Sequence, residues 1–278
     1  MRFAIYFLVI LLALSACKRN GKEEKVQDEL KTIEDKTIEK EVQVSDSRIV
    51  YRVPTPIEFF MFYRNAGGTF NENHLLESAD AEKYISTKEK AVAFGMFASN
   101  LAYSAVFGQN QHTISYFETG KLLADELGFT EGYGKDLMNR FQSNLDNVDS
   151  LYHLTADSYW KVFNFLEDQD KTRLLSYITV AGWIESLYLA FNSIDGYQDG
   201  EIIGCLADQQ YVIENLDAFI QEVHINETDQ DEIFRMVRML NERYALLYEN
   251  PDNIMMTKTQ FDSLKVVINR SRELLVKR

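Results

Sequence analysis

The feature that most constrains the fold is the stretch of residues 86–128, where apolar side chains recur three and four positions apart. That interval is the period of a helix face. Ser86 and Glu89 form a capping-box pair that predicts a helix start, and Gly128 predicts the left-handed residue that ends a helix. The pattern breaks once, and Asn110 is a suitable N-cap after the break. Two helices joined by so few residues must pack antiparallel, so the stretch predicts a helical hairpin.

The first of these helices carries a second apolar stripe beside the first, so it is apolar over most of its circumference. A helix of this kind is expected to be buried. Gly95, Ala98 and Ala102 are small, and we expect them to let a neighbouring helix approach closely.

The helical period continues to the end of the chain, and none of the three prolines falls inside a predicted helix. We therefore predict an all-α fold of antiparallel helical hairpins in one domain over residues 48–278. Three residues recur at one constant offset: Gly95, Ser99 and Gln111 match Gly182, Ser186 and Gln198. The hairpins fit a closed bundle or a repeat-like superhelical layout, and both remain open. Further helices are expected within residues 55–66, 130–148, 151–166, 174–191, 202–223, 228–247 and 257–275.

The amino-terminal end of the chain has the anatomy of an export signal over residues 1–16. A short basic start precedes an apolar run that is too short to span a bilayer comfortably. The tetrad that ends at Cys17 resembles a bacterial lipobox. The resemblance implies a signal peptide removed before Cys17, diacylglycerol on its thiol and a fatty acyl chain such as palmitate on its amine. The alternative is an ordinary secretory signal with a chance cysteine.

Residues 17–47 form a charged segment of mixed sign that lacks aromatic residues. Such a segment buries too little surface to fold, so we expect a flexible tether after the lipidated cysteine. A short strand is expected at residues 48–53. The aromatic run at residues 59–63 is expected in the core, with contact to the membrane as the alternative.

Charge and cysteine usage limit the partners and the chemistry. The formal charge is −14 and no basic stripe is present, which argues against nucleic-acid binding as a function class. Cys205 is the second of two cysteines, so a lipidated Cys17 leaves it without a disulfide partner. We expect Cys205 to be a buried small hydrophobe.

No motif for catalysis, for a cofactor or for a metal is visible. The four histidines lack zinc-site spacing, and neither a phosphate-binding loop nor a nucleophile elbow occurs. Asp149, His153 and Asp157 lie four apart on one helix face and could hold a metal. A surface charge ladder is the commoner explanation of such spacing. We therefore predict no catalytic residue, no metal and no cofactor.

Two polar residues interrupt otherwise apolar helices, and they define the candidate site. Asn100 and Glu185 both lie among apolar or small neighbours, and a carboxylate is costly to bury alone. With Tyr103 and Tyr188 they could line a ligand pocket between helices. The structural alternative is that Glu185 reaches solvent or is satisfied by a neighbouring helix.

Several segments resemble a family of helical lipoproteins of Bacteroidota with no established function. They are residues 53–56, 95–111, 122–128 and 182–185. The resemblance implies an α-helical fold, an envelope location and no catalytic residues to carry over.

The leading hypothesis is a non-enzymatic protein-binding or scaffold domain for an envelope protein. Its expected location is the outer membrane, where the lipid anchors it facing the periplasm or the cell surface. The alternative is a small-ligand-binding protein with a pocket near Glu185, and an envelope hydrolase is the weakest option.

Overall fold

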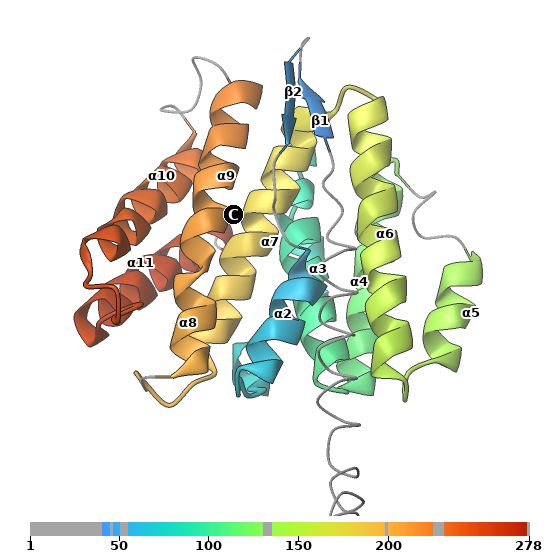
Figure 1. Cartoon of the computed structure of the whole chain (residues 1–278). Helices are drawn as coiled ribbons and strands as arrows, with labels where there is room; N and C mark the ends of the chain where they lie inside the picture. The colour runs from blue at the N-terminus through green and yellow to red at the C-terminus, as the bar shows by residue number, and fades with distance from the viewer. Residues whose placement is uncertain are drawn as a thin grey trace, which may run out of the picture. The chain divides into compact units, whose positions relative to one another are not determined.

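The computed structural model describes residues 41–44, 47–50, 55–129, 135–197, 200–224 and 231–276. Within these residues the chain forms ten α-helices, three 3-10 helices and one two-stranded hairpin, so the predicted all-α fold is confirmed (Figure 1). The α-helices are α2 (Pro56–Asn65), α3 (Thr87–Val106), α4 (Asn110–Leu127), α5 (Lys135–Ser143), α6 (Val148–Asp168), α7 (Thr172–Asn192), α8 (Glu201–Ala207), α9 (Gln209–Val223), α10 (Glu232–Ala245) and α11 (Lys258–Val276). The 3-10 helices are η1 (Glu72–His74), η2 (Ser78–Lys83) and η4 (Leu246–Glu249).

The hairpin consists of β1 (Glu41–Val44) and β2 (Ser47–Val50), which pair antiparallel with Val42 opposite Ile49. Part of the strand expected at residues 48–53 is thus observed. The interval predicted to be a flexible tether has β1 at its end, because β-branched residues alternate with polar ones there. Residues 17–40, which include Cys17, and residues 45–46 lie outside the described residues.

The ends of α3 and α4 show which capping predictions succeed. Ser86 Oγ accepts from the backbone N–H of Glu89 at 3.2 Å, and the Glu89 carboxylate accepts from the Ser86 N–H at 2.8 Å. Gly128 ends α4 with φ of 76°. Both predictions are confirmed, whereas the prediction of Asn110 as N-cap is wrong. The N-cap is Gln109, and the Asn110 side chain instead donates to Asp146 at 3.0 Å.

Helices α3 and α7 are the central pair, and they lie side by side in the middle of Figure 1. A Cβ atom built on Gly95 of α3 would lie 2.1 Å from the carbonyl oxygen of Ile178 on α7, so only glycine fits there. The close approach expected from the small residues of α3 is therefore observed. Helix α4 packs on α3, helix α11 packs on α7, and α10 packs between α9 and α11.

Helix α7 is apolar along nearly its whole length, which is typical both of a membrane-spanning helix and of the central helix of a folded domain. Among the described helices it is the one that is long and apolar enough to cross a membrane. However, 83% of its most apolar window is buried inside the protein. The central helix of a folded domain has the same composition, so α7 is weak evidence for a membrane span.

Two further expectations can be compared with the helices. In the aromatic run of α2, Phe59, Phe60 and Tyr63 are buried in the core, whereas Phe62 is 43% exposed. The continuous stripe expected over residues 202–223 is divided into α8 and α9 at Asp208, which itself keeps helical dihedral angles. The apolar face runs across the break because both helices pack against α7.

Candidate functional site

The centre of the candidate site is Glu185 on α7, whose exposed fraction is 0%. One carboxylate oxygen accepts a hydrogen bond from Asn100 Nδ2 of α3 at 3.0 Å. The other accepts from Arg272 Nε of α11 at 3.2 Å. A buried carboxylate is tolerated when a cation and a further donor occupy its lone pairs, and here two neighbouring helices supply them.

Arg272 is the partner that sequence reasoning missed, although a signal for it exists. The apolar stripe of α11 runs through Phe261, Leu264, Ile268 and Leu275, and Arg272 occupies the step between the last two. An arginine at a core position of a stripe implies a buried acceptor on the facing helix. Its side chain is 16% exposed, and its guanidinium lies 4.4 Å from the centre of the Tyr188 ring.

The amide of Asn100 uses both of its donors. Besides Glu185, Nδ2 donates to the Met96 carbonyl oxygen at 2.9 Å. Its Oδ1 accepts from the Leu76 backbone N–H at 3.1 Å. Asn100 therefore connects α3 to α7 and to the segment after η1, and no amide hydrogen remains for a ligand.

The structure brings three of the four expected pocket residues together and separates the fourth. Tyr188 lies at the edge of the group, with its ring 5.8 Å from that of His74. Tyr103 belongs to another cluster, because its hydroxyl lies 2.8 Å from Ser193 Oγ and 2.8 Å from the carbonyl oxygen of Thr69. The hydroxyl of a tyrosine lies far from its own backbone. Tyr103 can therefore bond to groups that Asn100, one turn earlier on α3, does not contact.

Burial dominates the electrostatics of the group. It raises the pKa of Glu185, and the charge of Arg272 and the Asn100 hydrogen bond oppose the rise without cancelling it. The pKa of Tyr84 is raised to about 12, mainly by burial and to a smaller extent by the nearby Glu185 carboxylate. The pKa of Tyr116 is raised for the same reasons, and its hydroxyl donates to the Leu76 carbonyl oxygen at 2.6 Å.

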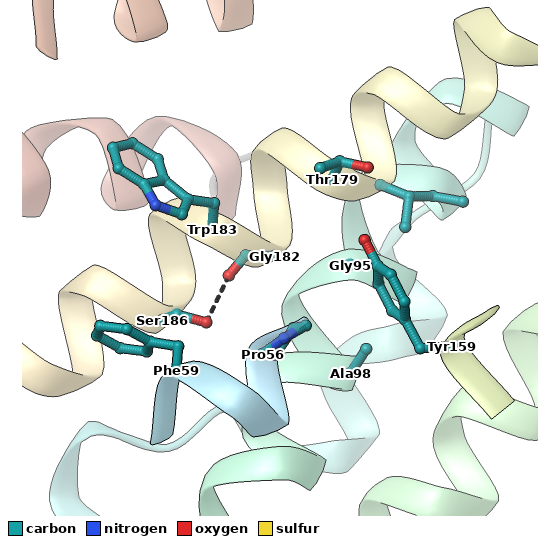
Figure 2. A pocket seen from close by; sticks show the side chains of 10 residues that line it. Pro56, Phe59, Gly95, Ala98, Tyr159, Thr179, Gly182, Trp183 and Ser186 are labelled. Atoms are coloured by element: carbon teal, nitrogen blue, oxygen red, sulfur yellow. Dashed lines mark hydrogen bonds between the residues drawn. The ribbon is translucent and has the colours of Figure 1, made fainter. Parts of the chain in front are cut away.

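Two small adjacent cavities share Pro56, Ala98 and Tyr159, so both lie among α2, α3 and α6. The first also reaches α7, and the second also reaches α4 and α5. Figure 2 shows the first, with Ser186 and Trp183 from α7 at one side and Tyr159 at the other. Each has a volume of about 20 Å³. A volume of this size holds roughly one water molecule. Glu185 is not among the lining residues of either cavity.

The nearest approach to a nucleophile and base among the described residues is Ser176 with His224. Ser176 Oγ lies 2.7 Å from His224 Nε2, and both side chains are buried. However, the serine hydroxyl donates its hydrogen to the Arg173 carbonyl oxygen at 2.8 Å. A hydroxyl has one hydrogen, so while Ser176 donates it to Arg173 the imidazole does not receive it as a general base would.

The metal alternative rests on Asp149, His153 and Asp157, and all three are exposed on α6. Across the described part of the chain, no group of three or more histidine, cysteine or acidic side chains is placed to hold a metal ion. Exposed side chains at this spacing form the surface ladder that was the commoner expectation.

Comparison of the chain with protein families, with characterised proteins and with solved structures gives no match. The function is therefore argued from the residues and their geometry alone. The role of Glu185 and its neighbours in ligand binding stays a prediction, and such a ligand would have to displace Arg272.

Proposed function

We propose that the chain is a lipid-anchored protein of the outer membrane whose helical domain binds a protein partner without catalysing a reaction. The observation that carries the proposal is the concentration of exposed large apolar side chains in one part of the sequence. Isolated apolar residues on a surface are normal, whereas a gathered set is typical of an interaction site. Among the described residues nine such side chains are exposed, and residues 246–255 hold four of them: Leu246, Tyr248, Ile254 and Met255.

The state of Glu185 supports the same proposal. Its two oxygens are occupied by Arg272 and Asn100, so the most unusual polar group of the core acts as a cross-link between helices. A domain whose buried polar group is fully hydrogen-bonded within the fold is suited to present a fixed surface. The small-ligand alternative requires an opened site at Glu185, where the carboxylate would exchange its present partners for those of the ligand.

The anchor is proposed from the sequence around Cys17, and it is tested by fractionation. The Cys17→Ser protein should leave the membrane fraction, because several acyl chains are needed for stable anchoring. Cys205→Ser is the matched control and should stay with the membranes. Persistent membrane association of the Cys17→Ser protein would contradict the lipobox.

Partner binding is tested by purifying the lipidated protein from its native membranes after mild cross-linking. Mass spectrometry should identify a protein recovered at a constant stoichiometry across preparations and absent when the tag is on an unrelated lipoprotein. A chain that is recovered alone, with a small molecule retained, would overturn the proposal in favour of the ligand-binding alternative.

A further inference from the structure

Arg272 of α11 is bound to the carboxylate of Glu185 through only one of its N–H groups. Its side chain is 16% exposed, and its Nε donates to Glu185 at 3.2 Å. A guanidinium carries five N–H donors, and arginine frequently binds a carboxylate through two of them in parallel. Among the described residues, no acceptor is bonded to either terminal amino group of Arg272. The edge of the guanidinium that these two groups form is therefore available to a ligand.

The guanidinium of Arg272 is also held by an aromatic ring. It lies 4.4 Å from the centre of the Tyr188 ring, which is within the range of a cation–π contact. The Tyr188 ring meets the His74 ring edge-on, at 5.8 Å and with an angle of 83° between the planes. Burial is the largest cause that lowers the pKa of His74, so this imidazole is neutral at neutral pH. A cation fixed in this way loses little conformational entropy when a ligand binds.

Asn269 supplies a second donor next to Arg272. It is partly exposed and lies three residues earlier on α11, so the two side chains share one helix face. Its Oδ1 accepts from Asn192 Nδ2 of α7 at 2.7 Å, and that same Nδ2 donates to the Tyr188 carbonyl oxygen at 2.8 Å. Asn269 and Arg272 therefore border the same turn of α7. Because the oxygen of Asn269 is occupied, its NH₂ group is what remains for a ligand.

The carboxylates nearest to these donors leave them unoccupied. Glu185 is bonded to Arg272 through Nε alone. Glu273, the next residue of α11, is exposed, and it forms no hydrogen bond or ion pair with Arg272 within the described part of the chain. Lys265 lies one turn before Asn269 on the same helix face and adds a second cation. The side-chain groups that α11 leaves unbonded here are donors.

We propose that Arg272 and Asn269 form a binding site for the oxyanion of a small molecule, which is a carboxylate or a phosphate group. Two oxygens of this group accept from the terminal amino groups of Arg272, because the planar fork of arginine matches their spacing. The amide of Asn269 donates to one of the same oxygens. The ligand adds to Arg272 and leaves its bond to Glu185 in place, unlike the pocket expected around Glu185. The inference goes beyond the proposed partner-binding function, and its failure would leave that function untouched.

The place of binding is tested by NMR of the full-length lipidated protein in detergent, through the Nε–Hε signals of its arginines. Sodium phosphate and sodium acetate are titrated separately at constant neutral pH and constant ionic strength, in exchange for sodium chloride. The Arg272 signal should shift and saturate with at least one probe. Saturation with phosphate alone, acetate alone or both supports the site and identifies which oxyanions it accepts. No shift, or a linear shift shared with the exposed neighbour Arg270, would overturn the site.

Asn269→Asp removes the amide donor while keeping the shape of the side chain. The new carboxylate can still accept from Asn192, so the fold should survive, but it repels the ligand and competes for Arg272. The affinity for the probe that binds, measured by titration calorimetry, should fall by at least about tenfold. Asn253→Asp makes the same change of charge at an exposed position before α11 and should leave the affinity unchanged. Equal affinities of the two variants would overturn the site.

Arg272→Lys tests the planar fork of the guanidinium. Lysine keeps a cation beside Glu185, which preserves the fold, but it lacks the pair of parallel N–H groups. The affinity should fall by about tenfold, whereas Arg270→Lys on the exposed side of α11 should leave it unchanged. An unchanged affinity of a folded Arg272→Lys protein would overturn the site. An equal loss in both arginine variants would assign the binding to general surface charge and would also overturn it.

Discussion

Ser99 on α3 donates a hydrogen bond of 2.6 Å to the carbonyl oxygen of Gly182 on α7. Ser186, one turn further along α7, lies 3.1 Å from the Ser99 hydroxyl. Gly95 lies one turn before Ser99, and a Cβ atom built on it would lie 2.1 Å from the Ile178 carbonyl oxygen of α7. Two pairs that recur at a constant offset in the sequence, Gly95 with Gly182 and Ser99 with Ser186, are thus the residues that face each other across the helix crossing.

The first prediction concerns the two glycines of this crossing. Gly95→Ala should lower the free energy of unfolding by about 3 kcal/mol, because the new methyl group meets rigid backbone. Gly182→Ala is the matched control. Its Cβ would lie 3.1 Å from the Gly95 carbonyl oxygen, and the better helix propensity of alanine offsets about 1 kcal/mol. Urea unfolding followed by circular dichroism measures both, and equal losses would contradict the assigned geometry.

The second prediction concerns the buried ion pair. Arg272→Met should cost about 3–5 kcal/mol at neutral pH, because it leaves the Glu185 carboxylate buried without a cation. Adding Glu185→Gln to that variant should recover part of the loss, since the remaining group is neutral. A double variant as unstable as Arg272→Met alone would show that the arginine acts through packing on Tyr188 instead of through charge.

The third prediction is the pH dependence that Glu185 contributes. Burial raises its pKa in the folded state, so the folded chain binds more protons than the unfolded chain between the unfolded pKa of about 4.3 and the higher folded pKa. Stability from this group is therefore present below that window and is lost as pH rises through it. The free energy of unfolding of the wild type, relative to that of Glu185→Gln, should therefore decrease as pH rises from about 4 to 8. A flat difference would contradict the raised pKa.

The fourth prediction uses Asp231, for which the opposite sign is expected. Burial raises its pKa, but hydrogen bonds from Lys88 and Tyr177 outweigh burial, and the net pKa is lowered. The contribution of Asp231 to the free energy of unfolding is present above its unfolded pKa of about 3.9. It is lost as pH falls through its pKa in the folded state. Asp231→Asn should therefore destabilise the protein at neutral pH and have little effect at strongly acid pH. A loss that is independent of pH would indicate a purely structural role.

The fifth prediction concerns the thiol of Cys205. Burial, with a smaller effect from Asp208, raises its pKa to about 12. A disulfide reagent at about pH 8 should modify the folded protein at least 100-fold more slowly than the urea-unfolded protein. The Cys17→Ser variant allows Cys205 to be followed as the single thiol. Rapid modification of the folded form would show that the side chain is accessible.

Local rules account for what the sequence predicted well. The capping pair of Ser86 with Glu89 connects atoms three residues apart, so neighbouring residues determine it. The helical period likewise identified α3 as buried. Asn110 shows the limit of such rules. It is a residue type suited to an N-cap, but the helix begins one residue earlier than expected, so Gln109 occupies the N-cap position.

The contacts of the candidate site were less accessible to sequence reasoning because they are not local. Glu185 and Arg272 are 87 residues apart, and only the packing of α11 on α7 brings them together. The sequence indicated that Glu185 needed a partner but not which residue it was. Tyr103 was grouped with Asn100 because they lie on one side of α3, and its hydroxyl reached another set of acceptors.

From the crossing of α3 and α7 we also expect an order in which the domain assembles. Helices α3 and α4 are adjacent in the chain and can form their hairpin early, since closing a short loop is fast. The glycine and serine face of α3 meets α7 only after the intervening chain is ordered, with Ser99 and Ser186 separated by 87 residues. We therefore expect the closing of this long loop to limit the folding rate, and the face of α3 to stay exposed to solvent until α7 arrives.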